Sequence, residues 1–363
     1  MRLLRQPVLA GKKILLIDKA PRRGNDRTWC FWEKEPGFFE PIVYRRWKSL
    51  QFYGSGFSRT LDTAPYEYKM IRGIDFYTHC FAEIERHHNV DIAYGNVDAV
   101  AAVPGGALVT LNGETTRAGY VFNSILFEKP PAGKRQHHLL QHFKGRIIET
   151  AGPVFDSGTA TLMDFRVEQD AGASFVYIMP FSTSRALVEY TVFSAETLPP
   201  EMYNKALNDY IHRFLRLDTY SIIEEETGVI PMTNYAFPLY KGHIINIGTA
   251  GGQTRGSSGY TFRFIQKRVE AIVQALVTTG KPFTGGGLLS KKASFYDSVL
   301  LHILAGGKLS GEQVFSRLFS KNTAQAIFRF LDDESSLQND LSVIATLPVL
   351  PFLGAALAEG KPW

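Results

Sequence analysis

Glu189 is the side chain whose surroundings in the sequence point most directly to chemistry. It lies in the apolar run 186–193, where alternation places Leu187, Glu189 and Thr191 on one face of a predicted strand. A carboxylate buried on that face is costly unless it is protonated or paired, and desolvation raises its pKa. Such a group is a candidate general acid. If the strand is half exposed, Glu189 belongs to its solvated face instead, and the segment alone leaves both interpretations open.

A glycine-rich loop supplies the second candidate site. Residues 243–249 form a short apolar strand that leads into a loop ending at Gly259, and a helix with Phe262 and Ile265 on its apolar face follows. Small residues let the backbone approach a ligand closely, and a helix N-terminus can face a negative or electron-rich group. The residues expected to bind the ligand are Gly248, Thr249, Ala250, Gly251, Gly252 and Gly259. An ordinary strand-to-helix turn has the same pattern.

Asp18 ends a third segment of interest. Residues 13–18 (KILLID) are typical of a buried parallel strand, and residues 1–8 are predicted to be the tail of a helix that stops near Gly11. In dinucleotide-binding units, an acid in this position accepts hydrogen bonds from the ribose hydroxyls. The strand and G-x-G-x-x-G fingerprint that open such units do not occur in this sequence. Buried strands that end in Asp are also common elsewhere. Together, Asp18 and the glycine loop fit the two ends of a flavin site.

The composition narrows the classes of function. The chain has 363 residues, of which 45% are hydrophobic and 21% charged, so a folded protein with a large core is expected. Its 26 Phe and 16 Tyr favour either a very large core or a site for a large apolar ligand. Two cysteines cannot build a disulfide framework or a four-cysteine zinc site. The net charge of +5 is spread along the chain and no histidine motif has metal-ligand spacing, which argues against nucleic acid and metal as ligands.

The remaining pattern predicts the elements that position these residues. We expect a helix over 75–88, short strands over 90–123, a linker at 129–134, a strand-rich section over 141–232 that contains a helix over 198–217, and helices from 294 onward. Residues 175–180 and 186–193 are predicted to be neighbouring strands. The uncharged run 341–357 is interrupted by two prolines and does not predict a membrane span. It is interpreted either as a buried C-terminal segment or as a contact with a membrane surface.

Several segments together resemble the lycopene cyclase family of flavoproteins, and within it the bacterial lycopene β-cyclases. The segments that carry the resemblance follow in family order and are residues 13–18, 25–32, 68–77, 121–124, 162–167, 175–182, 187–191, 228–232 and 247–262. A set of this length is specific, and it covers most of the chain from about residue 13 to 278. The helical region from 294 matches only loosely.

The resemblance implies an α/β fold. It consists of a Rossmann-like FAD/NAD(P)-binding domain of the aromatic-hydroxylase type, an inserted β-rich substrate domain and a helical C-terminal tail. The expected FAD-binding segments are residues 1–35, 65–130 and 240–278, the substrate-domain segments are 36–64 and 131–239, and the helical region is 279–363. Full-length members begin with the strand and glycine fingerprint, so the resemblance implies an N-terminally truncated chain in which Met1 falls inside the family's first helix.

The resemblance also implies an activity. A lycopene β-cyclase, an isomerase of the intramolecular lyase class, converts lycopene through γ-carotene to β-carotene without net redox change, with reduced FAD and with NAD(P)H as electron donor. Glu189 matches the glutamate of the family's L-[IV]-E-x-T segment and is the expected acid and base, with Asp164 or residues 224–226 next in line. An apolar substrate and no predicted span imply a cytoplasmic protein associated peripherally with the inner face of the membrane, without nucleic acid partners.

Other interpretations stay open at this point. A flavin-dependent NAD(P)H oxidoreductase of the same fold, such as a hydroxylase or a geranylgeranyl-type reductase, would consume NAD(P)H stoichiometrically. An inactive, truncated flavoprotein is the second alternative. The three consecutive glutamates at 224–226 commonly indicate a solvated face rather than a site.

Overall fold

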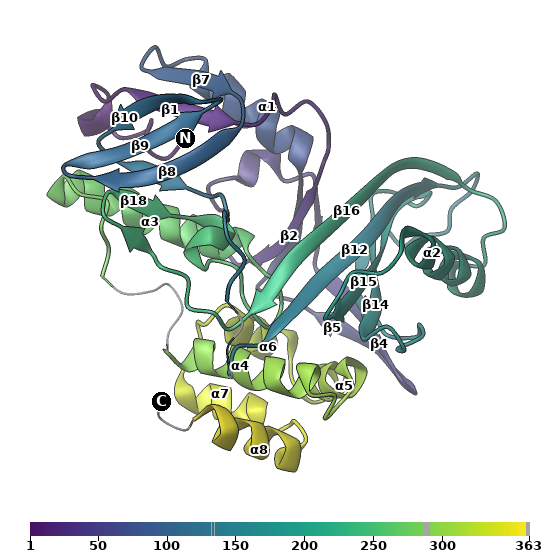
Figure 1. The fold of residues 1–363 in the computed structure, drawn as a ribbon. Coiled ribbons are helices and arrows are strands. Elements are labelled where there is room, and N and C mark those ends of the chain that lie inside the picture. Colours follow the sequence, from purple (N-terminus) through teal and green to yellow (C-terminus); the bar gives the residue numbers. More distant parts are fainter. Residues whose placement is uncertain (132, 134, 286–290, 361–363) are drawn as a thin grey trace.

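The computed structural model describes residues 1–131, 133, 135–285 and 291–360, and these form a mixed α/β fold (Figure 1). Its largest element is a seven-stranded sheet in which only the β13–β4 pair is parallel. In spatial order the strands are β16 (Ser221–Thr233), β12 (His138–Glu149), β15 (Arg185–Ser194), β14 (Ala173–Pro180), β13 (Thr159–Asp164), β4 (Ser49–Gly54) and β5 (Phe57–Asp62). The predicted neighbours 175–180 and 186–193 are therefore confirmed as the antiparallel pair β14–β15.

The two faces of this sheet are buried against different partners. Helix α2 (Pro200–Leu215) covers one face, where Val176 and Val188 pack with Leu207. The opposite face contributes side chains such as Phe175 and Leu187 to a larger core. Because both faces are covered, every residue of the central strand β14 is buried, and nearly all of them are apolar.

The larger core also contains a second sheet and the C-terminal helices. The sheet has the order β2 (Thr28–Glu33), β6 (Glu67–Arg72), β3 (Arg45–Trp47). The helices are α4 (Lys291–Ala305), α5 (Gly311–Lys321), α6 (Ala324–Leu331), α7 (Leu337–Ile344) and α8 (Val349–Glu359). Trp32 of β2 stacks on Phe328 of α6 with ring centroids 4.4 Å apart. The helical region is thus an integral part of the core that supports the sheets.

The remaining elements form a layer near the N-terminus (Figure 1). β1 (Ile14–Asp18) pairs in parallel with β7 (Val90–Tyr94), and β11 (Val121–Asn123) pairs in parallel with β18 (Ile244–Asn246), which also pairs with β17 (Tyr240–Lys241). A meander follows β7 and consists of β8 (Val97–Val103), β9 (Gly106–Leu111) and β10 (Glu114–Ala118). The other helices are α1 (Gly73–Ile84), α3 (Phe262–Thr279) and the short 3₁₀ turns η1 (Pro7–Leu9), η2 (Glu40–Ile42) and η3 (Gly248–Gly251).

One local prediction is wrong. Residues 1–8 do not form the tail of an α-helix; the backbone makes turns, with Leu4 N–H donating to Met1 O, and then the 3₁₀ helix Pro7–Leu9. Pro7 has no N–H and cannot continue a preceding helix, which explains the break. The helices expected over 75–88 and 198–217 are confirmed as α1 and α2. Residues 132 and 134 of the expected linker, and the last three residues of the expected helical tail, lie outside the described residues.

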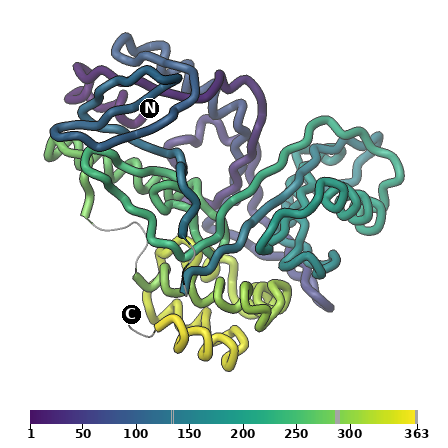
Figure 2. Tube along the Cα trace, viewed as in Figure 1, coloured from purple at the N-terminus to yellow at the C-terminus, as the bar shows by residue number. Residues whose placement is uncertain are grey.

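Strand β16 carries a bulge close to its start. Across β12, Ile147 pairs with Glu224 while Ile148 pairs with Ile222, so Ile223 is an extra residue. Beyond the bulge the register is regular from Glu224 to Thr233. Figure 2 shows that the chain enters β12 and leaves β16 side by side at the other end of this antiparallel strand pair.

The C-terminal apolar run forms α7 and α8, each with one face buried and the other exposed. Val343, Leu347 and Ala355 are buried, so part of the run belongs to the core. The exposed apolar side chains are Leu337, Leu341, Val349, Leu350, Leu353 and Leu357. A segment buried throughout is therefore the wrong interpretation. Among the described helices, none is both long and apolar enough to cross a bilayer.

Candidate functional site

Two glutamates meet above a glycine on the inner face of the seven-stranded sheet. Gly145 on β12 pairs with Glu189 on β15 and with Glu226 on β16, and the two carboxyl groups share a hydrogen bond. A Cβ added at Gly145 would lie 3.2 Å from Cγ of Glu226 and 3.5 Å from Cβ of Glu189. The missing side chain at this position is what lets the two carboxyl groups reach each other across the intervening strand.

Each carboxyl group of the Glu189–Glu226 pair has one hydroxyl partner. Thr191 Oγ1 donates to Glu189 Oε1 at 2.9 Å, and Thr28 Oγ1 donates to Glu226 Oε2 at 3.0 Å. Thr191 lies two residues after Glu189 and shares its face, as the alternation predicts. Within the described part of the chain, no lysine or arginine forms an ion pair with either carboxyl group. The pair is thus held by hydrogen bonds without a neutralising cation.

The electrostatics favour one shared proton. Glu189 and Glu226 keep intermediate exposure, yet enough protein surrounds them for desolvation to matter. Desolvation, reinforced by the charge of Glu226, raises the pKa of Glu189 well above its ordinary value. Desolvation also raises the pKa of Glu226, although hydrogen bonds from Thr28 and Glu189 oppose that shift. Since two carboxyl groups can hydrogen-bond only when one is protonated, Glu189 is the member that holds the proton.

The groups around the pair are neutral and largely aromatic. Tyr177 on β14 faces Glu189 in register and hydrogen-bonds to Tyr260, which follows the glycine-rich loop. Cys30 on β2 hydrogen-bonds to Tyr68 on β6. Burial raises the pKa of all four groups, so each stays protonated at neutral pH. A ligand at the pair would meet an acid framed by phenol rings and a thiol.

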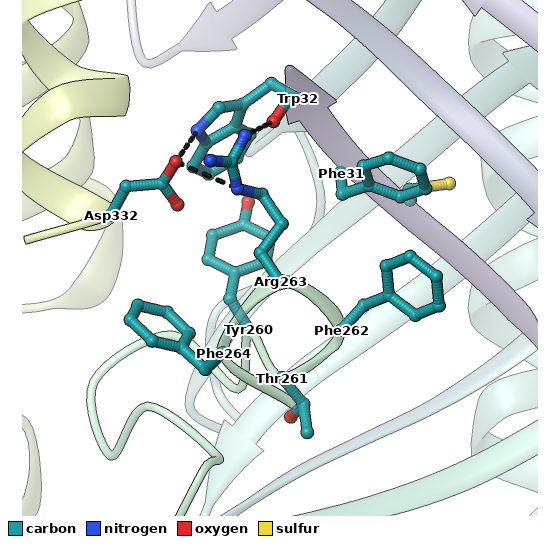
Figure 3. Close-up of a pocket in the computed structure, with 9 residues that line it drawn as sticks. Phe31, Trp32, Tyr260, Thr261, Phe262, Arg263, Phe264 and Asp332 are labelled. Atoms are coloured by element: carbon teal, nitrogen blue, oxygen red, sulfur yellow. Dashed lines mark hydrogen bonds and ion pairs between the residues drawn. The ribbon is translucent and has the colours of Figure 1, made fainter. Parts of the chain in front are cut away.

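A small aromatic pocket continues from Cys30 towards α6 (Figure 3). Phe31 stacks on Phe262 with centroids 4.7 Å apart, and Trp32 meets Tyr260 edge to face at 4.8 Å. Asp332 closes the pocket by accepting a hydrogen bond from Trp32 Nε1 at 3.0 Å and pairing with the Arg263 guanidinium at 3.2 Å. Burial raises the pKa of Asp332 to about 6, against the attraction of Arg263. The aromatic rings present apolar faces to the pocket. Asp332, the only acid among the residues that line it, is already bound to Trp32 and Arg263.

The other carboxylates named from the sequence have different environments. Asp164 is fully buried and accepts hydrogen bonds from Arg166 and from Tyr210 OH at 2.6 Å, so it belongs to a structural ion pair. Glu225 points to the opposite face of the sheet and pairs with Lys144 and Arg146. Only Glu224 and Glu226 of the three consecutive glutamates turn inward, because side chains alternate along β16.

Asp18 ends strand β1 as predicted, but its carboxylate is already bound. Arg22 donates to both oxygens, at 3.0 Å to Oδ2 and 2.9 Å to Oδ1, and Lys19 N–H donates as well. Although desolvation opposes it, the hydrogen bonds from Arg22 and Lys19 lower the pKa of Asp18. A ribose at Asp18 would have to displace Arg22 or share the oxygens with it.

The glycine-rich loop fits a flavin better than Asp18 does. Gly248 and Gly252 have φ of +62° and +69°, which favour glycine, and a Cβ added at Gly248 would come only into ordinary contact with Ser124 Cβ at 3.9 Å. A Cβ at Gly251 would lie 2.3 Å from Asn246 O, so this glycine is required by the turn itself. A Cβ at Gly259 would meet Gln141 on β12, which shows that the end of the loop packs on the inner face of the sheet.

The structure therefore brings some of the predicted site residues together and leaves others apart. The end of the loop approaches the carboxyl pair through the Tyr260–Tyr177 hydrogen bond, and Gly259 packs against Gln141 of β12, whereas Asp18 makes no contact with Glu189 among the described residues. Sequence reasoning missed Gly145, Thr28 and the pairing role of Glu226. A glycine inside an otherwise regular strand was the available signal, because such a residue often marks a close approach.

Comparisons with known proteins identify the family. The family model described as lycopene cyclase protein matches residues 6–357. A lycopene beta-cyclase from Pantoea ananas is 28% identical over 229 residues, which are 61% of this chain and 56% of that protein. The chain thus spans about half the length of the curated relatives it matches.

Solved structures agree on the fold. A geranylgeranyl bacteriochlorophyll reductase-like protein from Thermoplasma acidophilum superposes with a TM-score of 0.60 at 14% identity, over 95% of this chain and 92% of the other. A flavoprotein/dehydrogenase from Cytophaga hutchinsonii gives 0.59 at 13% identity, over 97% and 95%. The expected α/β fold of flavoprotein type is thereby confirmed. From the match along nearly its whole length, the chain belongs to the lycopene cyclase family.

Proposed function

We propose that this chain carries the cyclisation site of a lycopene β-cyclase, an isomerase of the intramolecular lyase class that converts lycopene through γ-carotene to β-carotene. The observation that carries the proposal is the hydrogen-bonded Glu189–Glu226 pair across Gly145, where desolvation and the charge of Glu226 raise the pKa of Glu189 well above its ordinary value. Family membership and the 28% identical lycopene beta-cyclase support the choice of substrate. Ring closure starts with a proton delivered to an alkene, and that step requires such an acid.

Glu189 acts as acid and base in this proposal. Its proton adds to the terminal double bond of a ψ-end, the resulting tertiary cation is attacked by a neighbouring double bond, and a proton lost from the new ring returns to Glu189. Thr191 orients the carboxyl group through the hydrogen bond to Oε1. A positioned acid of this kind contributes about 10²–10⁴-fold to rate.

The aromatic side chains protect the cation. Tyr177 and Tyr260 lie next to the pair, and the electron-rich faces of aromatic rings attract cations. Because these rings and Cys30 lack a free base at neutral pH, they do not quench the cation by taking its proton. In this proposal a bound substrate completes the packing around the pair and reduces the access of water, which favours ring closure over hydration.

We infer that the cofactor is reduced FAD, with NAD(P)H as electron donor. The residues that would hold it are Gly248, Thr249, Ala250, Gly251, Gly252 and Gly259 at the flavin end, and Asp18 at the ribose end once Arg22 shares or yields its oxygens. When bound, an anionic reduced flavin supplies negative charge near the developing cation. The similarity in fold to a flavoprotein/dehydrogenase supports this inference. In the same proposal, residues 1–35, 65–130 and 240–278 form the FAD-binding domain, and 36–64 and 131–239 the substrate domain.

The exposed apolar side chains of α7 and α8 support peripheral contact with the cytoplasmic face of the membrane. Leu350 is 81% exposed and Leu353 54%, and residues 341–358 contain no charged side chain. Transfer of such a surface from water into the interfacial region of a bilayer is favourable, because it lowers the free energy. Replacing Leu350 and Leu353 by Ser should reduce co-sedimentation with lipid vesicles, while the same change at Ile222 and Ile223 of β16, which are 46% and 45% exposed, should not. Equal sedimentation of both double variants and the unchanged protein would contradict membrane contact through these helices.

Product analysis tests the cyclase proposal. The chain is supplied with lycopene, FAD and NADPH, and the carotenoids are separated by chromatography. We expect γ-carotene first and then β-carotene, with far fewer NADPH molecules consumed than rings formed. Stoichiometric NADPH consumption with a reduced product would instead indicate a flavin oxidoreductase. A chain that binds FAD but leaves lycopene unchanged would indicate an inactive flavoprotein.

A further inference from the structure

The hydrogen bond between Glu189 and Glu226 joins two acidic groups that have no cation as a partner among the described residues. Both residues lie on neighbours of β12, on the inner face, and Gly145 is the only residue between them in register. Thr28 donates to Glu226 and Thr191 donates to Glu189, and neither hydroxyl supplies a full charge. Two ionised carboxylates this close repel each other strongly in a desolvated site.

From this geometry we propose that Glu226 stays ionised and shares one proton with Glu189, so that the pair releases and recovers that proton within a single turnover. The inference rests on the proposed cyclase function and deepens it. Glu226 is a positioning residue here, because it acts on the substrate only through Glu189.

The proton balance of the reaction suits such a pair. In the first step the O–H bond of Glu189 breaks and a C–H bond forms on the alkene, which leaves the pair with two negative charges and the substrate with one positive charge. After ring closure a C–H bond breaks, its electrons form the ring double bond, and the proton returns to Glu189. No electrons or net protons are exchanged. The repulsion between the two carboxylates makes Glu189 a stronger base at the moment when it must recover the proton.

The other titratable groups that face the pair do not replace Glu226 in this role. Those from neighbouring elements are Cys30 on β2, Tyr68 on β6, Tyr177 on β14, Tyr260 after the loop, and Asp26 and Glu224 beside Glu226. The thiol and phenols stay neutral because burial raises the pKa of each. Asp26 is paired with Arg22 and Arg27, and Glu224 accepts a hydrogen bond from Asn25. Glu226 is the one ionisable group hydrogen-bonded to Glu189 among the described residues.

The first experiment needs no substrate. Infrared difference spectroscopy of the purified full chain, titrated through neutral pH, should show the C=O stretch of a protonated carboxylic acid that persists above the pKa of Asp332, which is about 6. Glu189→Gln should remove this band. Glu225→Gln, the same change on the adjacent residue and opposite face, should leave it in place. Absence of a Glu189-dependent band at about pH 7, where ordinary carboxyl groups are ionised, overturns the shared proton whatever the activity of the protein.

The second experiment isolates Glu226. Glu226→Gln keeps the hydrogen bond but removes the charge, so the Glu189 band should titrate at a lower pH, by about one unit or more for a pair that is strongly coupled. In the cyclisation assay, the alkaline limb of the pH–rate profile should shift in the same direction. If Glu226→Gln does not fold, Glu226→Asp, which retains the charge, should keep the band near its original titration midpoint. A midpoint in Glu226→Gln equal to that of Glu225→Gln overturns the role of Glu226.

The two experiments separate this inference from the proposed function. A Glu189 band that responds to Glu226, in a protein that never converts lycopene, supports the pair and refutes the cyclase. Cyclisation in a protein without the band supports the cyclase and refutes the shared proton.

Discussion

Glu225 and Glu226 are adjacent on β16 and have opposite environments. Glu225 faces the side of α2, is partly exposed, and pairs with Arg146 at 2.8 Å and Lys144 at 3.1 Å. Hydrogen bonding from Arg146 lowers its pKa, with Lys144 adding to the shift. Glu226 faces the inner core, pairs with another carboxyl group, and has a raised pKa because of desolvation. One peptide bond thus separates a carboxylate neutralised by two cations from one held against another carboxyl group.

Strand alternation, rather than local composition, therefore sets the environment of each glutamate in this sheet. The cations that neutralise Glu225 come from β12, on the face where Lys144 and Arg146 also approach α2. The inner face has no cation at the corresponding position; it has Gly145. Removing charge on one face should therefore affect stability, while removing it on the other should affect proton transfer.

The largest expected effect is that of Glu189→Gln on activity. The amide cannot donate a proton to an alkene, and a general acid contributes about 10²–10⁴-fold, so conversion of lycopene should fall by an amount near the upper end of that range. Chromatographic measurement of β-carotene, with FAD content and thermal midpoint recorded alongside, checks this. Near-normal product formation by Glu189→Gln would show that the proton comes from elsewhere.

A larger side chain at Gly145 should push the Glu189 and Glu226 carboxyl groups apart. An added Cβ lies 2.9 Å from Leu187 Cδ1 and 3.2 Å from Glu226 Cγ, and valine adds two further methyl groups. Overpacking of this kind costs about 1–3 kcal/mol, so Gly145→Val should lower the free energy of unfolding in urea and abolish cyclisation. Gly152→Ala, at a position where an added Cβ meets no neighbour within 4 Å, is the control. Equal stability of the two variants contradicts the crowding argument.

The stability of Glu189→Gln should depend on pH. The folded protein raises the pKa of Glu189, so above the pKa of the unfolded chain, about 4.3, the unfolded state releases a proton that the folded state keeps. The contribution of Glu189 to stability therefore falls as pH rises from that value towards the folded pKa. Glutamine does not titrate, so the variant does not lose this stability. The thermal midpoint of Glu189→Gln should therefore rise relative to that of the wild type as pH rises. A constant difference across this range would refute the raised pKa.

Glu225→Gln should have the smallest effect. Its side chain is 40% exposed, and exposed ion pairs contribute about 0–1 kcal/mol, so the loss in the free energy of unfolding at neutral pH should be within that range. Because the folded pKa of Glu225 is lowered, its contribution is present above the unfolded pKa and disappears as pH falls through the folded pKa. Urea denaturation at neutral and acidic pH measures both. Cyclisation by this variant should equal that of the wild type.

The sequence predicts the parts of this molecule that depend on local pattern. The β14–β15 hairpin, the helices α1 and α2, and the shared face of Glu189 and Thr191 all follow from periodicity over a few residues. The pairing of Glu189 with Glu226 does not, because it depends on the register of two strands with β12 between them, and nothing local specifies that register. Likewise, the sequence places Asp18 at a strand end but does not reveal that the loop after it folds back to bring Arg22 onto both carboxylate oxygens.

The bulge at Ile223 has a consequence for how this family can vary. The extra residue lies between the turn that follows α2 and the segment 224–233 that presents Glu226. If a residue is inserted or deleted in that turn, the bulge can change size and keep the register of the strand beyond it. Without a bulge, the same change would invert the orientation of every side chain that follows. Evolution can therefore change the length of the chain between α2 and β16 while the inward-facing carboxylate keeps its place.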